Sequence, residues 1–184
     1  MNQKIEICYA KEEDVPDIMS VMDISCQLAR DASWYCADDE NYVRKHLHEN
    51  GFILKAEAEG RLAGFLIVRF PKNANDNLGS YVRLTKEEMQ YVAHMESAAV
   101  SPDYRGYKLQ RCLMDEGEKI LKDTQYKYLM GTAHPENIYS VNNFLQLDYE
   151  IVAEDNKYGG LPRYVFYKKI EKIRKALLLK VQRF

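Results

Sequence analysis

The chain has 184 residues, enough for one domain with an ordinary core, and its 46% hydrophobic and 29% charged residues exclude a disordered or fibrous protein. A formal net charge of −2 argues against a general nucleic-acid-binding protein. The N-terminus lacks the apolar core of a secretory signal, no membrane span is visible, and the four cysteines have no metal-ligand spacing. We therefore expect a cytoplasmic protein with free thiols, without a membrane or nucleic-acid partner and without a metal.

Strand and helix patterns alternate along the first half of the chain. Residues 4–9 alternate in polarity and predict a strand. Apolar residues then recur at helical spacing behind acidic starts, which predicts helices from 14 to about 29 and from 38 or 39 to 49. Residues 52–58 and 62–70 predict a hairpin.

The second half opens with the sequence TKEE at residues 85–88, which has the capping-box pattern of a short helical turn. The later elements are expected as a strand over 91–100, a helix over 109–121, a strand over 127–132, a helix from 137 to about 147, and strands over 149–153 and 164–170. In the helix after residue 137, the residues expected to face inward are Ile138, Val141, Phe144 and Leu145.

The chain is organised around residues 91–121, a strand that runs through a basic turn into a helix. Gly106 interrupts regular secondary structure and so marks the turn. The first N–H groups of the helix that follows have no partner within the helix. Arg105, Lys108 and Arg111 add positive charge at this end, where the helix dipole disfavours cations unless an anion is bound. The stretch predicts a phosphate site; an ordinary strand–helix unit with a solvated basic turn is the alternative.

The sequence AVSPDYRGYKLQRCLM in this stretch resembles the coenzyme-A-binding motif of the GNAT superfamily of N-acetyltransferases, Ala-Val-x-Pro-x-x-Arg/Gln-x-x-Gly-x-Gly/Ala. The matching residues are Ala99, Val100, Pro102 and Arg105. The two later small positions hold Lys108 and Gln110 instead, and Gly106 lies two residues before the first of them.

The order of the expected elements is also that of the GNAT fold. The resemblance implies an α/β (α+β) fold with a mixed, largely antiparallel sheet of about seven strands, splayed at the fourth and fifth, and flanked by about four helices. It covers residues 1–170 as an acyl-CoA N-acyltransferase domain. The basic tail, residues 171–184, lies outside it and either packs on the body, packs on a partner chain or is disordered.

The resemblance implies acetyl-CoA as the cosubstrate. Small side chains on the key strand, Ser97 and Ala98, permit close approach of the pantetheine arm, and simple packing against a helix is the alternative. The residues expected to bind the cofactor are Ala98, Ala99, Val100, Arg105, Gly106, Tyr107, Lys108, Leu109, Gln110 and Arg111 on the strand, turn and helix start, with Asn137 and Asn143 on the later helix. An asparagine at a helix start is by default a cap, which is the alternative for Asn137.

Acetyl transfer to an amine needs a proton acceptor. Period two puts His94 and Glu96 on one face of the key strand, so we expect Glu96 as the base and His94 as helper or alternate. A carboxylate half out of water is expected to have a raised pKa. The alternative is a His–Glu hydrogen bond that only satisfies two half-buried groups.

A proton donor for the leaving thiolate is harder to identify. The family places a tyrosine in Asn-x-x-Ala-x-x-x-Tyr, and the stretch NIYSVNNF puts Phe144 at that position. Tyr139 is the expected substitute, although helix geometry turns it to another face, and water is the other option. We expect His134 on a loop surface and Cys112 as an inward-facing core thiol.

These observations predict an N-acetyltransferase that moves an acetyl group from acetyl-CoA to a primary amine of a small molecule or peptide by direct attack. The alternatives are an acyl-CoA-binding sensor or partner module without catalysis, and a purely structural α/β domain. Acidic residues in the two early helices hint at a cationic acceptor, or are only solvated helix faces. The oligomeric state, monomer or homodimer, stays open.

Overall fold

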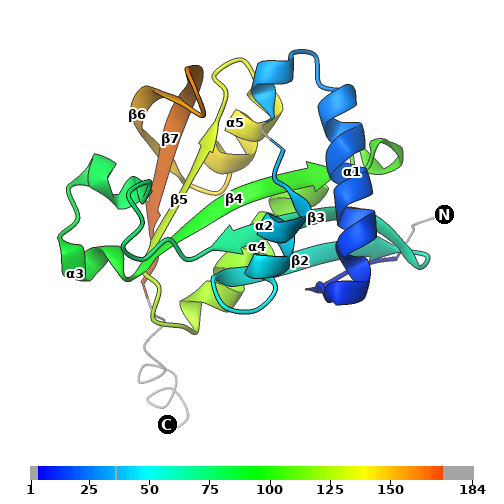
Figure 1. Cartoon of the computed structure of the whole chain (residues 1–184), viewed down its shortest axis with the longest axis horizontal. Coiled ribbons are helices and arrows are strands. Elements are labelled where there is room, and N and C mark those ends of the chain that lie inside the picture. The colour runs from blue at the N-terminus through cyan, green and yellow to red at the C-terminus, as the bar shows by residue number, and fades with distance from the viewer. Residues whose placement is uncertain (1–3, 36, 172–184) are drawn as a thin grey trace, which may run out of the picture.

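The computed structural model describes residues 4–35 and 37–171, which form one seven-stranded mixed sheet (Figure 1). The strand order is β1-β2-β3-β4-β5-β7-β6, and only the pairing of β4 with β5 is parallel. The strands are β1 (Ile5–Tyr9), β2 (Gly51–Ala58), β3 (Arg61–Arg69), β4 (Val92–Val100), β5 (Tyr128–Ala133), β6 (Glu150–Lys157) and β7 (Leu161–Lys169). This sheet confirms the expected fold class.

Helices cover both faces of the sheet. The helices are α1 (Val15–Gln27), α2 (Glu40–His46), the short α3 (Lys86–Met89), α4 (Leu109–Lys122) and α5 (Ile138–Leu145). Two 3-10 helices matter for the site, η2 (Ala32–Trp34) and η3 (Leu78–Val82). Helices α1 and α2 pack on one face and α4 on the other. The helices thus form an outer layer on each side of the sheet.

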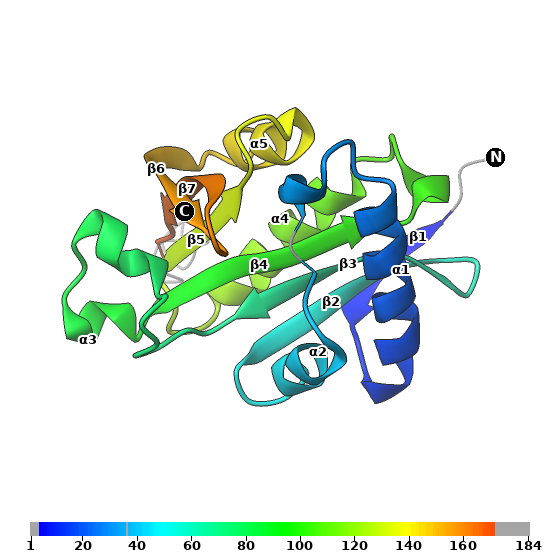
Figure 2. The same ribbon diagram turned by 45° about the horizontal axis from the view of Figure 1, so that its top comes forward.

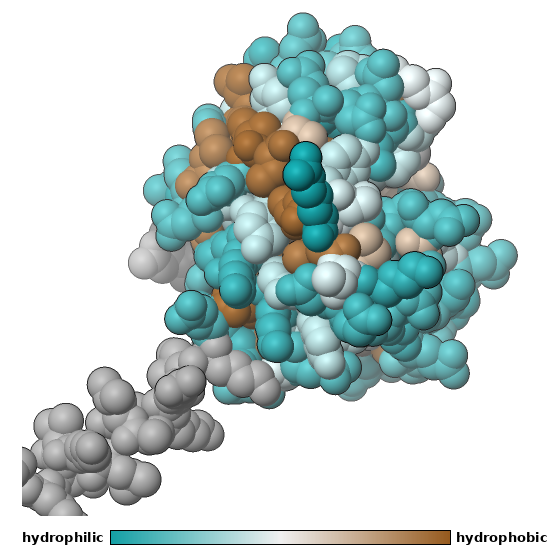
Figure 3. Space-filling model, turned by 90° about the vertical axis from the view of Figure 1, so that its left-hand side faces the viewer, coloured by the Kyte–Doolittle hydropathy of each residue, from teal (hydrophilic) through white to brown (hydrophobic). Residues whose placement is uncertain are grey.

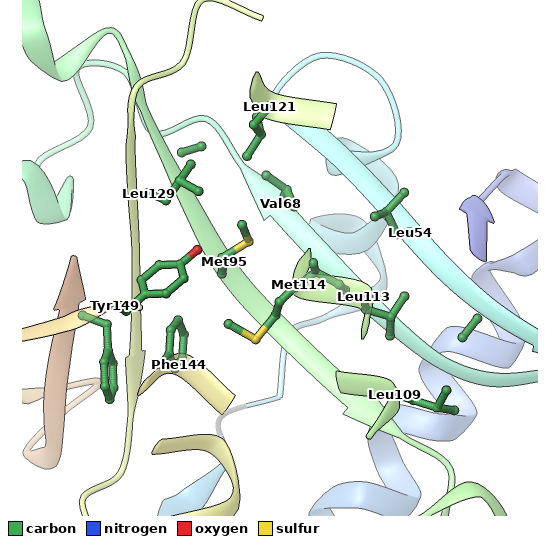
Figure 4. Close-up of a cluster of buried hydrophobic side chains, with 14 of the residues drawn as sticks. Leu54, Val68, Met95, Leu109, Leu113, Met114, Leu121, Leu129, Phe144 and Tyr149 are labelled. Carbon is green, nitrogen blue, oxygen red and sulfur yellow. The ribbon is translucent and has the colours of Figure 1, made fainter. Parts of the chain in front are cut away.

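Alternation along the central strands explains the two layers. In β3, Phe65 and Ile67 belong to the cluster under α1, whereas Leu66 and Val68 belong to the cluster under α4. A strand that is buried on both faces reads as a continuous apolar run, as β3 does. Figure 4 shows the α4 cluster, in which the apolar stripe of α4 meets the sheet.

The sheet opens between β4 and β5. These strands pair only from Val92 with Tyr128 to Met95 with Gly131, and they then diverge (Figure 2). In the β3–β4 ladder Val68 pairs with Met95 and the adjacent Ile67 pairs with Ser97, so Glu96 is an extra residue in β4. Such a β-bulge bends the strand that carries it. The carboxyl half of β4 follows β3, while β5 follows β7 along its whole length.

The structure corrects three expectations about side chains. Ile138 and Leu145 are 55% and 44% exposed, because α5 has only two turns and buries Phe144 alone. Cys112 is exposed, because the buried stripe of α4 runs beside it. His134 is buried at 7% exposure and stacks on Trp34 of η2, so it is not a surface loop residue.

The face seen from the side of α3 is mainly hydrophilic, with one patch of hydrophobic residues in its upper half (Figure 3). Of the expected tail, only Glu171 is among the described residues. Within residues 4–35 and 37–171, no helix combines the length and hydrophobicity that a membrane crossing requires.

Candidate active site

A cleft of about 270 Å³ lies where β4 and β5 separate. One side of it is lined by Trp34, Tyr35 and Asp38 from the connection between α1 and α2, and by Tyr42 from α2. The other side is lined by Ala98, Gln110, Met114, Thr132 and Phe144 from β4, α4, β5 and α5. In Figure 4, Met114 of α4 and Phe144 of α5 lie next to each other at this opening. The cleft therefore joins the two faces of the sheet.

The turn before α4 has the conformation of an anion-binding loop. Gly106 and Lys108 both have positive φ, of 88° and 60°. Lys108 is the N-cap of α4 and makes no side-chain cap bond, and the first helical bond runs from Cys112 N to Lys108 O at 3.1 Å. Among the described residues, the backbone N–H groups of residues 109–111 have no hydrogen-bond partner. They are the donors that a phosphate at a helix start uses.

The left-handed conformation of Lys108 explains its departure from the family pattern. The pattern has glycine at this position, and glycine adopts positive φ without cost. A side chain there costs about 1 kcal/mol or more. Lys108 keeps the required backbone shape at φ 60°, ψ 24°, so the substitution preserves the turn and adds an exposed charge to it.

Gln110, at the second departure, links α4 to α5 beside the cleft. Asn143 Nδ2 donates to Gln110 Oε1 at 2.9 Å, and Gln110 Nε2 donates to Ser140 Oγ at 3.3 Å. Asn137 Oδ1 accepts from Ser140 N at 3.2 Å, so Asn137 caps α5. This cap uses the side-chain oxygen of Asn137 and not its amide nitrogen.

Glu96, at the bulge of β4, is fixed by three neighbours. Its Oε2 lies 3.2 Å from His94 Nδ1, and its Oε1 accepts from the Tyr42 hydroxyl at 3.0 Å and lies 3.5 Å from Arg69 Nη1. Arg69 in turn makes two bonds of 2.8 Å to Asp76. The structure thus brings together the predicted pair and adds three residues that sequence analysis missed.

His94 is buried at 2% exposure and faces η3 rather than the main cleft. The backbone N–H of Leu78 donates to His94 Nε2 at 3.1 Å. Since a backbone N–H can only donate, Nε2 carries no proton, and the proton resides on Nδ1 and is donated to Glu96. In this tautomer both ring nitrogens are occupied, and His94 orients Glu96.

The pKa of Glu96 is lowered, so the expectation of a raised pKa is wrong. Burial alone raises it, but the hydrogen bond from His94, the charge of Arg69 and the Tyr42 hydroxyl together outweigh burial. Glu96 is therefore ionised and held by donors at neutral pH.

Asp38 is the site carboxylate that sequence analysis missed. Burial raises its pKa to about 6, the negative charge of Glu96 adds to this, and a hydrogen bond with Ser97 opposes it. Ser97 Oγ also bonds to the Tyr35 hydroxyl at 2.7 Å. The sequence identified Asp38 only as a possible helix start, because nothing near it in the chain marks the strand that it faces.

Neither aromatic residue of α5 offers a hydroxyl to the cleft. Phe144 is buried, stacks on Phe166 at 4.3 Å and points its ring tip at Gly131, where an added Cβ would lie 2.6 Å from Phe144 Cζ. Tyr139 is 61% exposed and is not among the residues that line the cleft. The tyrosine that lines the cleft from the β6–β7 hairpin is Tyr158, whose hydroxyl lies 3.3 Å from Thr132 Oγ1.

The model of the acetyltransferase (GNAT) family matches residues 20–149, which is most of the chain. The chain belongs to this family, whose members use acetyl-CoA as acetyl donor. No curated protein sequence gives a significant match.

Solved structures of similar fold agree with this family. The ribosomal-protein-S18-alanine N-acetyltransferase from Escherichia coli is 15% identical with a TM-score of 0.69, covering 94% of this chain and 97% of that chain. An acetyltransferase structure from Salmonella typhimurium with its cofactor acetyl-CoA is 16% identical with a TM-score of 0.68, covering 91% and 95%. A ribosomal-protein-alanine N-acetyltransferase from Brucella melitensis is 18% identical with a TM-score of 0.67, covering 90% and 99%. At these identities the likeness is one of fold.

Proposed function

We propose that this protein transfers the acetyl group of acetyl-CoA to a primary amine by direct attack of the amine. The observation that carries the proposal is the continuous cleft through the opening of the sheet. It connects the splayed edge of β4 beside α4 with a part that is lined by the carboxylates of Asp38, Asp76 and Glu96. A reaction between an activated acyl group and an amine needs such a space, since holding the two reactants together lowers the barrier by several kcal/mol, on the order of 7.

The donor half fits acetyl-CoA. The N–H groups that start α4 would hold the pyrophosphate, with charge from Arg105, Lys108 and Arg111. The unpaired edge of β4 at residues 96–100, with Ala98 and Ala99, would admit the pantetheine arm, and Asn137 and Asn143 lie on the neighbouring helix. The bound cosubstrate supplies the activated thioester carbonyl.

Direct attack is favoured over an acyl-enzyme. The hydroxyl of Ser97 is hydrogen-bonded to Tyr35 and lies beside Asp38, so its neighbours are a phenol and a carboxylate rather than a histidine base. The amine itself is therefore the nucleophile of the proposal.

The acceptor half fits an amine. Asp38 and Glu96 supply negative charge, and the rings of Trp34, Tyr35 and Tyr42 line the same space. Aromatic faces and carboxylates together attract an ammonium group. Two of the similar structures are named for the alanine of a ribosomal protein, so a peptide N-terminus belongs beside small amines among the acceptors to test.

The experiment is release of coenzyme A thiol from acetyl-CoA with n-propylamine, spermidine and the tripeptide Ala-Gly-Gly, with the acetylated amine identified by mass spectrometry. We expect amine-dependent thiol release and the matching amide. Binding of acetyl-CoA without release with any primary amine would favour the alternative of a non-catalytic acyl-CoA-binding module. Phe144 at the family's tyrosine position is the observation that keeps this alternative open.

A further inference from the structure

Three carboxylates line the cleft, those of Asp38, Asp76 and Glu96. Asp76 is bound to Arg69 by two hydrogen bonds of 2.8 Å, and the other two are held differently from each other. Glu96 has donors on both oxygens, from His94, Tyr42 and Arg69. A carboxylate in that setting is a poor proton acceptor, because protonation would sacrifice charge-assisted hydrogen bonds. For Asp38, the hydroxyl of Ser97 lowers the pKa of the carboxyl and burial raises it by more. The two groups therefore suit different tasks.

Two contacts position Asp38 and the residue that follows it. The N–H of Asp38 donates to Met22 Sδ of α1 at 3.3 Å, and the next residue, Asp39, caps α2 by accepting from Tyr42 N at 2.7 Å. The side chain projects toward the edge of β4 at Ser97, directly after the bulge. This edge is unpaired with β5, which is where the donor half of the cleft begins.

We infer that Asp38, rather than Glu96, binds the acceptor as an ammonium ion and accepts its proton. The inference rests on the proposed function. It makes Asp38 a catalytic residue and Glu96 a positioning residue that fixes Tyr42 and Arg69 around it.

Each proton of the step has a defined destination. The ammonium group R–NH₃⁺ loses one proton to the Asp38 carboxylate and becomes R–NH₂. Its nitrogen lone pair forms the N–C bond to the acetyl carbonyl while the C–S bond breaks. The second proton of the nitrogen goes to the departing thiolate, which leaves as the thiol, and Asp38 returns its proton to solvent. The products are the amide, the thiol and one proton.

The surroundings of Asp38 place its titration in a useful range. Charged and titratable groups face the site from every side: Asp39 on its own segment, Tyr42 on α2, Arg69 and Asp76 from the end of β3 and the segment after it, Glu96 on β4, and Tyr158 and Arg163 on the β6–β7 hairpin. With burial as the main cause, the pKa of Asp38 is raised to about 6. Above that pH the group is ionised, so it both attracts an ammonium ion and accepts a proton.

The pH dependence of kcat/KM with acetyl-CoA and n-propylamine tests this. If Asp38 is the base, kcat/KM of the wild-type protein should rise up to about pH 6 and then level off. Asp38→Asn should lower the rate at pH 7.5 by about 100-fold. Its remaining rate should follow the free amine and increase about tenfold per pH unit without levelling.

Two control variants separate the role of Asp38 from that of Glu96. Asp39→Asn keeps the helix cap and removes a charge that raises the pKa of Asp38 less than the charge of Glu96 does, so its acid limb should persist and move to lower pH by less than in Glu96→Gln. Glu96→Gln removes the charge that raises the pKa of Asp38, so its acid limb should persist but move to lower pH. Loss of the limb in Glu96→Gln together with its retention in Asp38→Asn would make Glu96 the base and overturn the inference.

A second readout needs no acceptor. In protein with ¹³C-labelled aspartate side chains, NMR titration should show one carboxyl that titrates near pH 6, and Asp38→Asn should remove that resonance. A spectrum without such a carboxyl contradicts the inference. If the Asp38 carboxyl titrates near pH 6 but the wild-type protein acetylates none of the amines, the result would instead contradict the proposed function.

Discussion

The two halves of the cleft are built in opposite ways. The donor half comes from one continuous stretch, in which β4, the basic turn and α4 follow each other. The acceptor half is assembled from segments far apart in the chain: the hydroxyls of Tyr35 and Tyr42 reach Ser97 and Glu96, which lie more than fifty positions later. A local motif can therefore specify where a cofactor binds, whereas the binding of the amine acceptor and the position of the proton acceptor depend on tertiary contacts.

Apart from the rate loss in Asp38→Asn, the largest expected effect concerns the donor half. Arg105→Glu places a negative charge beside the expected pyrophosphate, so coenzyme A affinity should fall by about 30-fold or more, measured by calorimetry. Lys119→Glu makes the same charge change near the other end of α4 and should leave affinity unchanged. Equal affinity of Arg105→Glu and wild type would remove this turn from the donor site.

The next largest effect is on stability, at the point where the donor and acceptor halves of the cleft meet. A Cβ at Gly131 would lie 2.6 Å from Phe144 Cζ and 3.1 Å from Met95 O. Gly131→Ala should therefore lower the free energy of unfolding by about 2 kcal/mol, measured by urea denaturation. The double variant with Phe144→Leu should regain part of this loss, because a leucine side chain has no ring tip to meet the added Cβ. If Gly131→Ala does not change the stability, Phe144 can move away from the added Cβ without a measurable cost.

A smaller effect tests the acceptor half without any ligand. The pKa of Asp38 in the folded protein is raised to about 6, above the value of about 3.9 expected in an unfolded chain. The ionised form therefore destabilises the fold above about pH 6, and this penalty disappears below about pH 4. Allowing for solvent screening, Asp38→Asn should stabilise the protein by about 1–2 kcal/mol at pH 7.5 and by almost nothing at pH 4. The same gain at both pH values would show that the charge is not responsible.

The smallest effect returns to the turn. Lys108→Gly relieves the left-handed strain, but it also increases the entropy of the unfolded chain, so a net gain of about 0.5 kcal/mol in thermal stability is expected. Lys108→Ala keeps the strain and should give no such gain. A loss of stability in Lys108→Gly would mean that the lysine side chain stabilises the turn.

The difference between local patterns and tertiary contacts also determines which features of the site the sequence could predict. Period two along β4 correctly predicted that His94 and Glu96 meet, since that pattern is local. It did not predict the sign of the Glu96 pKa shift: burial raises this pKa, the hydrogen bond from His94 lowers it most, and the further lowering by Arg69 and Tyr42 comes from other elements. Asp38 was missed for the same reason. Lys108 departed from the motif in chemistry but not in backbone conformation, which only coordinates reveal.

Hydrogen–deuterium exchange with and without coenzyme A tests the central claim most directly, namely that the start of α4 binds the donor beside the opening of the sheet. Coenzyme A should slow exchange at the backbone amides of residues 109–111, which have no hydrogen-bond partner among the described residues, and should leave exchange in β1 and β2 unchanged. Unchanged exchange at residues 109–111 with coenzyme A bound would contradict it.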